Sequence, residues 1–185
     1  MFGKYKDKDK YLGKSIEIVD DLTKMIVEIL SISSFHELKE KKELLKIYDE
    51  IKEIIKNYNL LIKEKNIKIN YNLKDEQIYI SKLAFDKIII NLISNSVKYT
   101  DQNGIINIGV KDGYFYIENS CKKLNKDQIE KSFELFYTEG KNNNSNGLGL
   151  YIIKNILTNY NIEYSFEKSK IGMLFKFKIP IKESK

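Results

Sequence analysis

The sequence contains no arginine, so lysine supplies all of its basic side-chain charge. The 185 residues include 32 lysines against 26 acidic residues, for a net charge of +6. Proteins that bind nucleic acid usually rely on the planar guanidinium group, which contacts phosphate or guanine through two parallel hydrogen bonds. Here the lysines are spread along the whole chain among acidic residues, a distribution typical of a solvated surface. We therefore expect no nucleic-acid partner.

Cysteine, proline and long apolar runs are also scarce. Cys121 is the one cysteine, so no internal disulfide can form, and a reducing cytoplasm fits this composition. The one proline is Pro180. No apolar run approaches the roughly 20 residues that a membrane-spanning helix needs, and no signal-peptide pattern opens the chain. With 42% hydrophobic residues, the chain is long enough for one globular domain and an appendage.

The first periodic segment runs from Tyr11 to about Ser34 and predicts one long helix. Its apolar residues recur at intervals of three, four and three, the spacing of a helix that packs in a bundle or coiled coil. The residues of this stripe are Val19, Leu22, Ile26 and Ile29, flanked by Ile16, Met25 and Leu30.

Beyond this segment the pattern alternates between strand and helix periods, which predicts an α+β fold. We expect a mixed sheet with helices on one side, a two-layer sandwich. Lys111-Asp112-Gly113 is a hairpin signal between two strands. The expected strands are 44–47, 67–73, 77–81, 105–110, 114–118, 164–168 and 174–179, and the expected helices are 51–65, 82–99, 127–136 and 148–159.

Two asparagines on one face of the 82–99 helix form the first candidate site. Asn91 and Asn95 are four residues apart in an otherwise apolar helix, although asparagine is a poor helix former. They either satisfy buried backbone groups or supply a carbonyl oxygen to magnesium. Lys98 lies one turn further, within reach of a phosphate, and Tyr99 offers an aromatic face. The helix alone leaves both interpretations open.

The second candidate site is Gly147-Leu148-Gly149-Leu150, at the start of the 148–159 helix. Glycines let the backbone approach a phosphate closely, and a helix N-terminus offers free N–H groups. The asparagine-rich segment before it, residues 140–146, has the composition of a lid. A glycine-rich turn before a helix is weak evidence alone. What makes the motif informative is that it follows the asparagine helix in the chain, and at this distance.

Together these motifs resemble the GHKL ATPase superfamily, and within it the catalytic domain of bacterial sensor histidine kinases, whose Bergerat fold would then apply. The asparagine box of that family is similar to NLISNSVKYT at 91–100, and its phenylalanine box to FELFY at 133–137. Its second glycine box resembles NGLGLYIIKNIL at 146–157. A glycine followed by an F-x-F-x-x-P strand matches Gly172 and 175–180. The resemblance covers about 37–181.

The resemblance implies an ATP- and magnesium-dependent protein histidine kinase. Asn95 would bind magnesium, Lys98 would contact phosphate and Tyr99 would lie near the adenine. Hydrolytic relatives carry a glutamate base where this chain has Asn91, and an amide cannot accept a proton from water. Phosphoryl transfer to a protein side chain is therefore implied, with Asn91 and Lys98 as catalytic residues. The remaining nucleotide contacts implied by the boxes are Asn119, Leu124, Phe136, Gly147, Leu148, Gly149 and Leu150.

The first glycine box departs from the family pattern, D-x-G-x-G-I. Asn119 replaces the aspartate that accepts a hydrogen bond from adenine, and Cys121 and Lys123 replace both glycines. A neutral acceptor in place of a carboxylate forfeits about 1 kcal/mol of binding, or about fivefold in affinity. Two alternatives follow: a non-catalytic pseudokinase scaffold, and a serine kinase of the same superfamily. The N-terminal helix argues against the serine kinase.

His36 lies in a segment, SFHELK, that imitates the phosphoacceptor box of these kinases. However, Lys41 stands where the family has proline, and too few residues separate His36 from Asn91 for a second dimerisation helix. We expect His36 to be a linker residue, with the acceptor histidine upstream. Residues 1–36 would be the hairpin turn and second helix of a dimerisation domain, and 37–185 the ATP-binding domain. The chain would be the cytoplasmic part of a membrane-anchored bacterial receptor that forms a homodimer and acts on a response regulator.

Overall fold

The computed structural model describes residues 10–16, 18–19, 22–23, 26, 41–138 and 146–182. The residues described between 10 and 26 are helical, as predicted, and the rest of the expected 11–34 helix lies outside the described residues. None of the described helices is long and apolar enough to cross a membrane.

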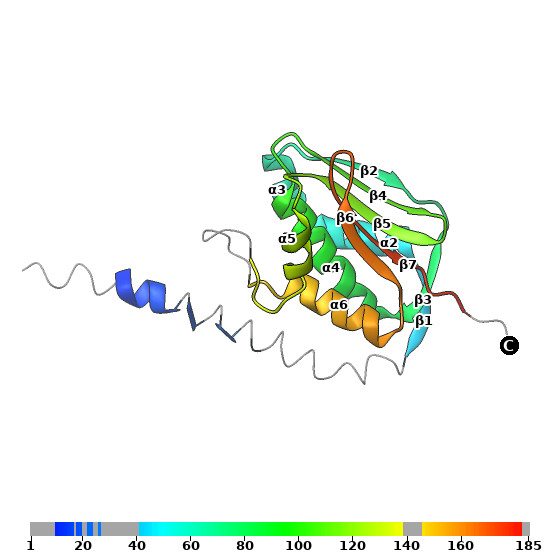
Figure 1. Ribbon diagram of the computed structural model, residues 1–185, viewed down its shortest axis with the longest axis horizontal. Coiled ribbons are helices and arrows are strands. Elements are labelled where there is room, and N and C mark those ends of the chain that lie inside the picture. The colour runs from blue at the N-terminus through cyan, green and yellow to red at the C-terminus, as the bar shows by residue number, and fades with distance from the viewer. Residues whose placement is uncertain are drawn as a thin grey trace, which may run out of the picture.

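From residue 42 onward, strands and helices follow the order that the periodicity predicts (Figure 1). The helices are α2 (Ile47–Lys56), α3 (Asn59–Glu64), α4 (Lys82–Tyr99), α5 (Lys126–Lys131) and α6 (Gly149–Asn159). The strands are β1 (Lys42–Lys46), β2 (Lys68–Asn72), β3 (Gln77–Ser81), β4 (Ile105–Lys111), β5 (Tyr114–Ser120), β6 (Tyr164–Lys168) and β7 (Gly172–Lys178).

Five strands form a mixed sheet in the order β2-β4-β5-β7-β6. Only β2 and β4 pair in parallel within it, and the other neighbours are antiparallel. β1 and β3 form a separate antiparallel pair. The predicted hairpin joins β4 to β5, because Asp112 and Gly113 both have the positive φ angles, 52° and 80°, of a two-residue type I′ turn.

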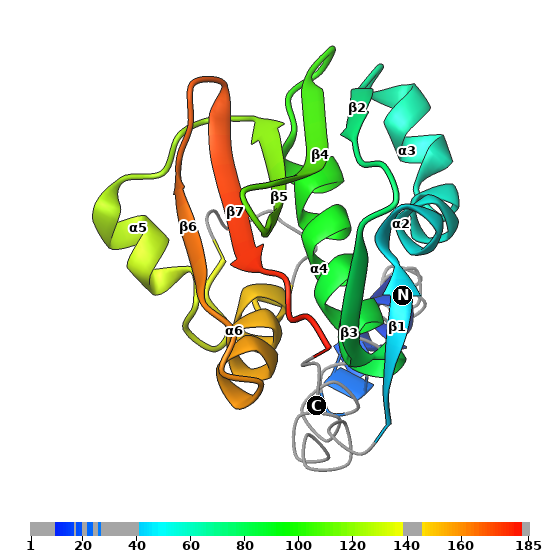
Figure 2. The ribbon, with the colours of Figure 1, turned by 90° about the vertical axis from the view of Figure 1, so that its right-hand side faces the viewer.

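The helices lie on one side of the sheet, which gives the two-layer α+β sandwich that was predicted (Figure 2). α4 runs behind the middle of the sheet and buries one apolar face there. The core also takes residues from β5, β7 and α6. Its buried members include Phe85, Ile88, Ile89, Leu92, Phe115, Ile117, Ile153, Ile156, Phe175 and Phe177.

Two expected helices are wrong in extent. The 51–65 helix is in fact α2 and α3, separated at Asn57 and Tyr58, where Tyr58 leaves helical geometry with φ −106° and ψ 3°. The apolar spacing continues across this short break, so periodicity did not reveal it. α5 ends at Lys131 rather than at Phe136, because the chain turns to bring the Phe133 ring against Tyr164, Phe166 and Phe175.

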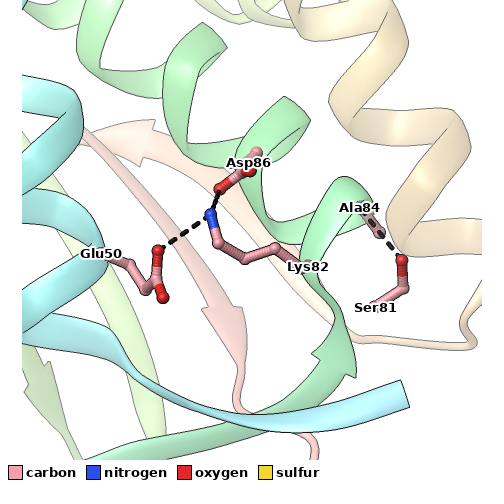
Figure 3. Close-up of polar contacts among 5 residues, drawn as sticks. All are labelled: Glu50, Ser81, Lys82, Ala84 and Asp86. Atoms are coloured by element: carbon pink, nitrogen blue, oxygen red, sulfur yellow. Dashed lines mark hydrogen bonds and ion pairs between the residues drawn. The ribbon is translucent and has the colours of Figure 1, made fainter. Parts of the chain in front are cut away.

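Specific contacts fix both ends of α4. At its start, the Ser81 hydroxyl accepts a hydrogen bond from the Ala84 N–H at 3.4 Å. Lys82 bridges Asp86, one turn further, and Glu50 on α2, with Nζ 2.9 Å from the Glu50 carboxylate (Figure 3). Burial lowers the pKa of Lys82, but the hydrogen bonds to Asp86 and Glu50 outweigh it and raise the pKa overall. These contacts hold α4 against α2.

Candidate functional site

The two asparagines of α4 face the start of α6. Asn91 donates from Nδ2 to the Lys87 carbonyl at 2.7 Å, which leaves its Oδ1 directed towards Gly149. A Cβ added to Gly149 would lie 2.9 Å from Asn91 Oδ1 and 3.4 Å from Asn95 Nδ2. The asparagine box and the second glycine box, separate in sequence, are therefore in contact, and only glycine fits at residue 149 without displacing Asn91.

The N-terminus of α6 has no side-chain cap. The N-cap residue is Leu148, and within the described part of the chain no side chain accepts a hydrogen bond from the first N–H groups of the helix. Ser81 caps α4 and Asn125 caps α5, whereas α2 and α3, like α6, have no side-chain cap from a described residue. Free N–H groups at the positive end of a helix dipole attract an anion. This anion-favouring end lies beside Asn91.

Gly147, the first glycine of this box, is joined to the phenylalanine box. Phe136 N–H donates to the Gly147 carbonyl at 3.1 Å. Both residues have a φ of 64°, and a Cβ on Gly147 would lie 2.5 Å from the Phe136 backbone. Gly147 is thus required both by its φ angle and by the close approach of the two chains.

Lys98 carries a buried ammonium group. Its Nζ is shielded from solvent and has no hydrogen-bond partner within the described part of the chain. It lies 5.5 Å from the centroid of the Tyr99 ring, a cation–π distance. Burial lowers the pKa of Lys98 below its usual value. An unpaired buried cation is costly unless an anion binds it.

Asn119 continues the buried side of β5 at the end of the strand. Alternate residues of β5 are buried, Phe115 and Ile117 before it, and Asn119 itself is only 9% exposed. Its amide makes no hydrogen bond to any described residue. Gly172 of β7 lets the strands meet here, since a Cβ on it would lie 2.2 Å from the Asn119 carbonyl oxygen.

The remaining predicted contacts differ in what they present. Tyr99 and Phe136 are 39% and 50% exposed, so part of each ring is open to a ligand. Leu148 is buried in the core, which leaves only its backbone for a ligand. Leu150 packs partly against the same core. Leu124, before α5, is partly exposed.

Sequence reasoning missed Lys65. Its Nζ donates to three carbonyls at the end of α4, those of Val97 at 3.1 Å, Lys98 at 2.6 Å and Thr100 at 2.8 Å. The turn that carries Lys98 and Tyr99 is therefore held by a residue more than thirty positions earlier. One lysine among 32 carries no local signal of such a contact.

These features fit a magnesium nucleotide. The free N–H groups of α6 and the Lys98 ammonium suit phosphate, and the Asn119 amide suits a polar base edge. The described residues contain no cluster of three or more His, Cys, Asp or Glu side chains that could cage a metal. Magnesium instead takes few protein ligands and shares phosphate oxygens, so the Asn95 amide oxygen meets its needs.

Comparison with known proteins identifies the family of the domain. Residues 81–183 match the family described as histidine kinase-, DNA gyrase B- and HSP90-like ATPase. The sensor histidine protein kinase HK06 of Streptococcus pneumoniae is 38% identical over 181 residues, which are 96% of this chain and 41% of HK06. The chain therefore spans less than half the length of this relative.

Two solved structures share the fold at lower identity. Histidine kinase ThkA, in complex with the response regulator protein TrrA, is 21% identical with a TM-score of 0.70, over 97% of this chain and 53% of that one. Full-length ShkA, in complex with AMPPNP, is 19% identical with a TM-score of 0.72, over 96% and 40%. Since the family match covers more than half of the chain, the protein belongs to the histidine kinase-, DNA gyrase B- and HSP90-like ATPases and contains the ATPase domain of a histidine kinase.

Proposed function

We propose that this domain binds magnesium-ATP and transfers its γ-phosphoryl group to a histidine side chain for two-component signalling. The observation that carries the proposal is the contact of Gly149 with Asn91 and Asn95, beside an uncapped helix N-terminus. ATP supplies the phosphoryl group, and the family to which the chain belongs supports its binding. The protein positions the nucleotide and neutralises the charge of its phosphates.

Each site residue has a role in the proposal. The N–H groups of residues 149–151 at the start of α6 hold phosphate oxygens, and the Lys98 ammonium neutralises their charge. The Asn95 oxygen binds magnesium. Asn119 accepts a hydrogen bond from the adenine amino group, and Tyr99 and Phe136 border the base. The Leu148 backbone and the partly buried side chains of Leu124 and Leu150 complete the walls of the proposed nucleotide site.

Asn91 favours transfer over hydrolysis. Its Nδ2 is engaged with the Lys87 carbonyl, and its Oδ1 is an amide oxygen of negligible basicity. It can orient a water or a metal ligand but cannot remove a proton from water. ATP therefore persists in the site until a nucleophilic imidazole meets it. That makes transfer to histidine the better-supported reaction.

The proposal puts the acceptor histidine upstream. His36 is then a linker residue at the end of segment 1–36, directly before the ATP-binding domain, 37–185. The described apolar residues between positions 10 and 26 are exposed, among them Ile16 and Val19 at 57% and 59%. Such a stripe suits pairing with a second copy of the chain. The partner downstream would be a response regulator, the class of protein with which ThkA forms its complex. The assembled protein would be membrane-anchored, with this domain in the cytoplasm.

The experiment is a titration of the protein with a non-hydrolysable magnesium-ATP analogue, monitored by calorimetry, on the wild type and on Asn95→Ala. We expect binding by the wild type and loss of the magnesium-dependent part of the affinity in the variant. No binding at millimolar nucleotide would refute the kinase function and favour the pseudokinase scaffold.

Asn155→Ala is the matched control. Asn155 also lies on a helix and donates its amide to a carbonyl four residues earlier, that of Tyr151 at 2.8 Å. It is on α6, beyond the turns that approach Asn91. Its loss should leave nucleotide binding unchanged, so an equal effect of the two substitutions would contradict the assignment of Asn95 to magnesium.

A further inference from the structure

The Asn119 side chain is mostly buried, and its amide has no hydrogen-bond partner among the described residues. It is 9% exposed, lies on the side of β5 that faces the helices, and makes no hydrogen bond with any described residue. Among the described residues, the fully buried polar side-chain atoms without a partner are Lys98 Nζ and Ser165 Oγ, so the Asn119 amide itself reaches solvent. The amide is therefore free to pair with a bound molecule.

The backbone next to Asn119 is tied to the C-terminal end of α4. The next residue, Ser120, accepts a hydrogen bond through its carbonyl from Asp101 N–H at 3.1 Å. Asp101 follows α4 directly, after Lys98 and Tyr99. The Ser120 hydroxyl also accepts from Ile105 N–H at 2.7 Å, which ties the start of β4 to the same place. The end of β5 is thus fixed against the turn that carries the buried ammonium.

An amide differs from a carboxylate in what it can recognise. A carboxylate only accepts hydrogen bonds, whereas an asparagine carries an acceptor oxygen and two donor hydrogens that exchange places when the amide turns over. Adenine presents a donor amino group at C6, and guanine presents an acceptor carbonyl at the same atom. A carboxylate therefore selects adenine and repels guanine, but an amide can pair with either.

No contact within the described part of the chain fixes the orientation of the Asn119 amide. Asn70, Asn107 and Glu118, on the opposite face of the sheet, form a chain of hydrogen bonds of 2.9 and 2.8 Å that sets the direction of each amide. Asn119 has no such neighbour among the described residues, so turning it over breaks no bond there.

From this, and on the basis of the proposed nucleotide-binding function, we infer that the site accepts both adenine and guanine nucleotides. The substrate class is then purine nucleoside triphosphates rather than ATP alone. The dissociation constants of magnesium-ATP and magnesium-GTP should differ by less than about tenfold. Restoring a carboxylate by Asn119→Asp should raise this ratio to about a hundredfold or more, because the guanine carbonyl would then face a mostly buried anion.

The test is displacement of a fluorescent adenosine diphosphate analogue by magnesium-ATP and by magnesium-GTP, measured for the wild type and Asn119→Asp. Asn72→Asp is the matched control, since it makes the same substitution on β2 at an exposed position on the opposite face of the sheet. The control should keep the wild-type ratio. Thermal unfolding monitors whether each variant folds. If Asn119→Asp does not fold, the ratio of the two dissociation constants in the wild type still tests the inference.

A wild-type ratio below about ten, together with a large rise in Asn119→Asp, supports the inference. Exclusion of GTP by a hundredfold or more in the wild type would overturn it while leaving ATP binding intact. Equal ratios in the wild type and Asn119→Asp would also overturn it, because Asn119 would not discriminate. If the fluorescent nucleotide itself fails to bind the wild type, the proposed function fails and the inference fails with it.

Discussion

Lys65→Met offers a direct test of how the nucleotide-binding end of α4 is held. The substitution keeps most of the apolar stem of the side chain and removes the ammonium group, which donates to the carbonyls of Val97, Lys98 and Thr100 at 2.6–3.1 Å. The last carbonyls of a helix have no partner within the helix. The lysine satisfies several at once and places a positive charge at the negative end of the helix dipole.

The magnitude follows from these contacts. A hydrogen bond to a charged group contributes about 1.5–3 kcal/mol, and the charge–dipole interaction about 0.3–1 kcal/mol. Lys65 is partly exposed, so water replaces some of these bonds in the variant, and hydrating the ammonium offsets part of the gain in the wild type. We expect Lys65→Met to lower the free energy of unfolding by about 2 kcal/mol, and Tm by about 4–8 °C.

The assay is urea denaturation followed by circular dichroism, with nucleotide affinity measured under conditions where both proteins are folded. Lys68→Met is the control, because Lys68 is an exposed lysine three residues away, on β2. It should change stability by less than about 0.5 kcal/mol. Equal effects of the two substitutions would refute the reasoning. Weaker nucleotide binding by Lys65→Met alone would show that the contact also positions Lys98 and Tyr99.

Three further predictions concern the site. Gly149→Ala should weaken magnesium-dependent nucleotide binding at least about tenfold, because its Cβ would displace Asn91, while unfolding shifts by less than about 1 kcal/mol; unchanged affinity with and without EDTA would contradict this. Burial lowers the pKa of Lys98, and a bound phosphate raises it again, so binding at alkaline pH should take up a proton and weaken as pH rises through the lowered pKa. Calorimetry in two buffers measures this uptake, which Lys98→Arg should abolish, and its absence in the wild type would count against phosphate contact. Incubation with radioactive ATP should leave this chain unlabelled, since His36 is a linker in our proposal, and an acid-labile phosphate on His36 would reverse that assignment.

The parts of the fold that the sequence predicted well are those with an uninterrupted period or explicit turn chemistry. α4 begins and ends as expected, because Ser81 caps it and the apolar residues keep a helical spacing throughout. The β4–β5 hairpin follows from Asp112-Gly113. The break between α2 and α3 was missed because a single turn of altered geometry leaves the apolar stripe in phase.

The site was predictable in its members but not in its contacts. The four boxes named Asn91, Asn95 and Gly149, while only the structure shows that Gly149 lies against both asparagines. The role of Lys65 could not be predicted, because its three bonds join residues more than thirty positions apart and depend on where the ends of α3 and α4 come together. The burial of Asn119 could not be predicted either, because it depends on how the end of β5 packs in three dimensions.

The two outer strands of the sheet bear on how the domain behaves at high concentration. β2 and β6 are the edges, and each is five residues long, whereas the three strands between them have seven. Lys68 and Asn70 on β2, and Glu167 and Lys168 on β6, lie at these edges. Short edges that carry charged side chains resist pairing with the edge of another molecule. The domain should therefore stay free of sheet-to-sheet aggregation when concentrated, and any self-association should use its helical surfaces.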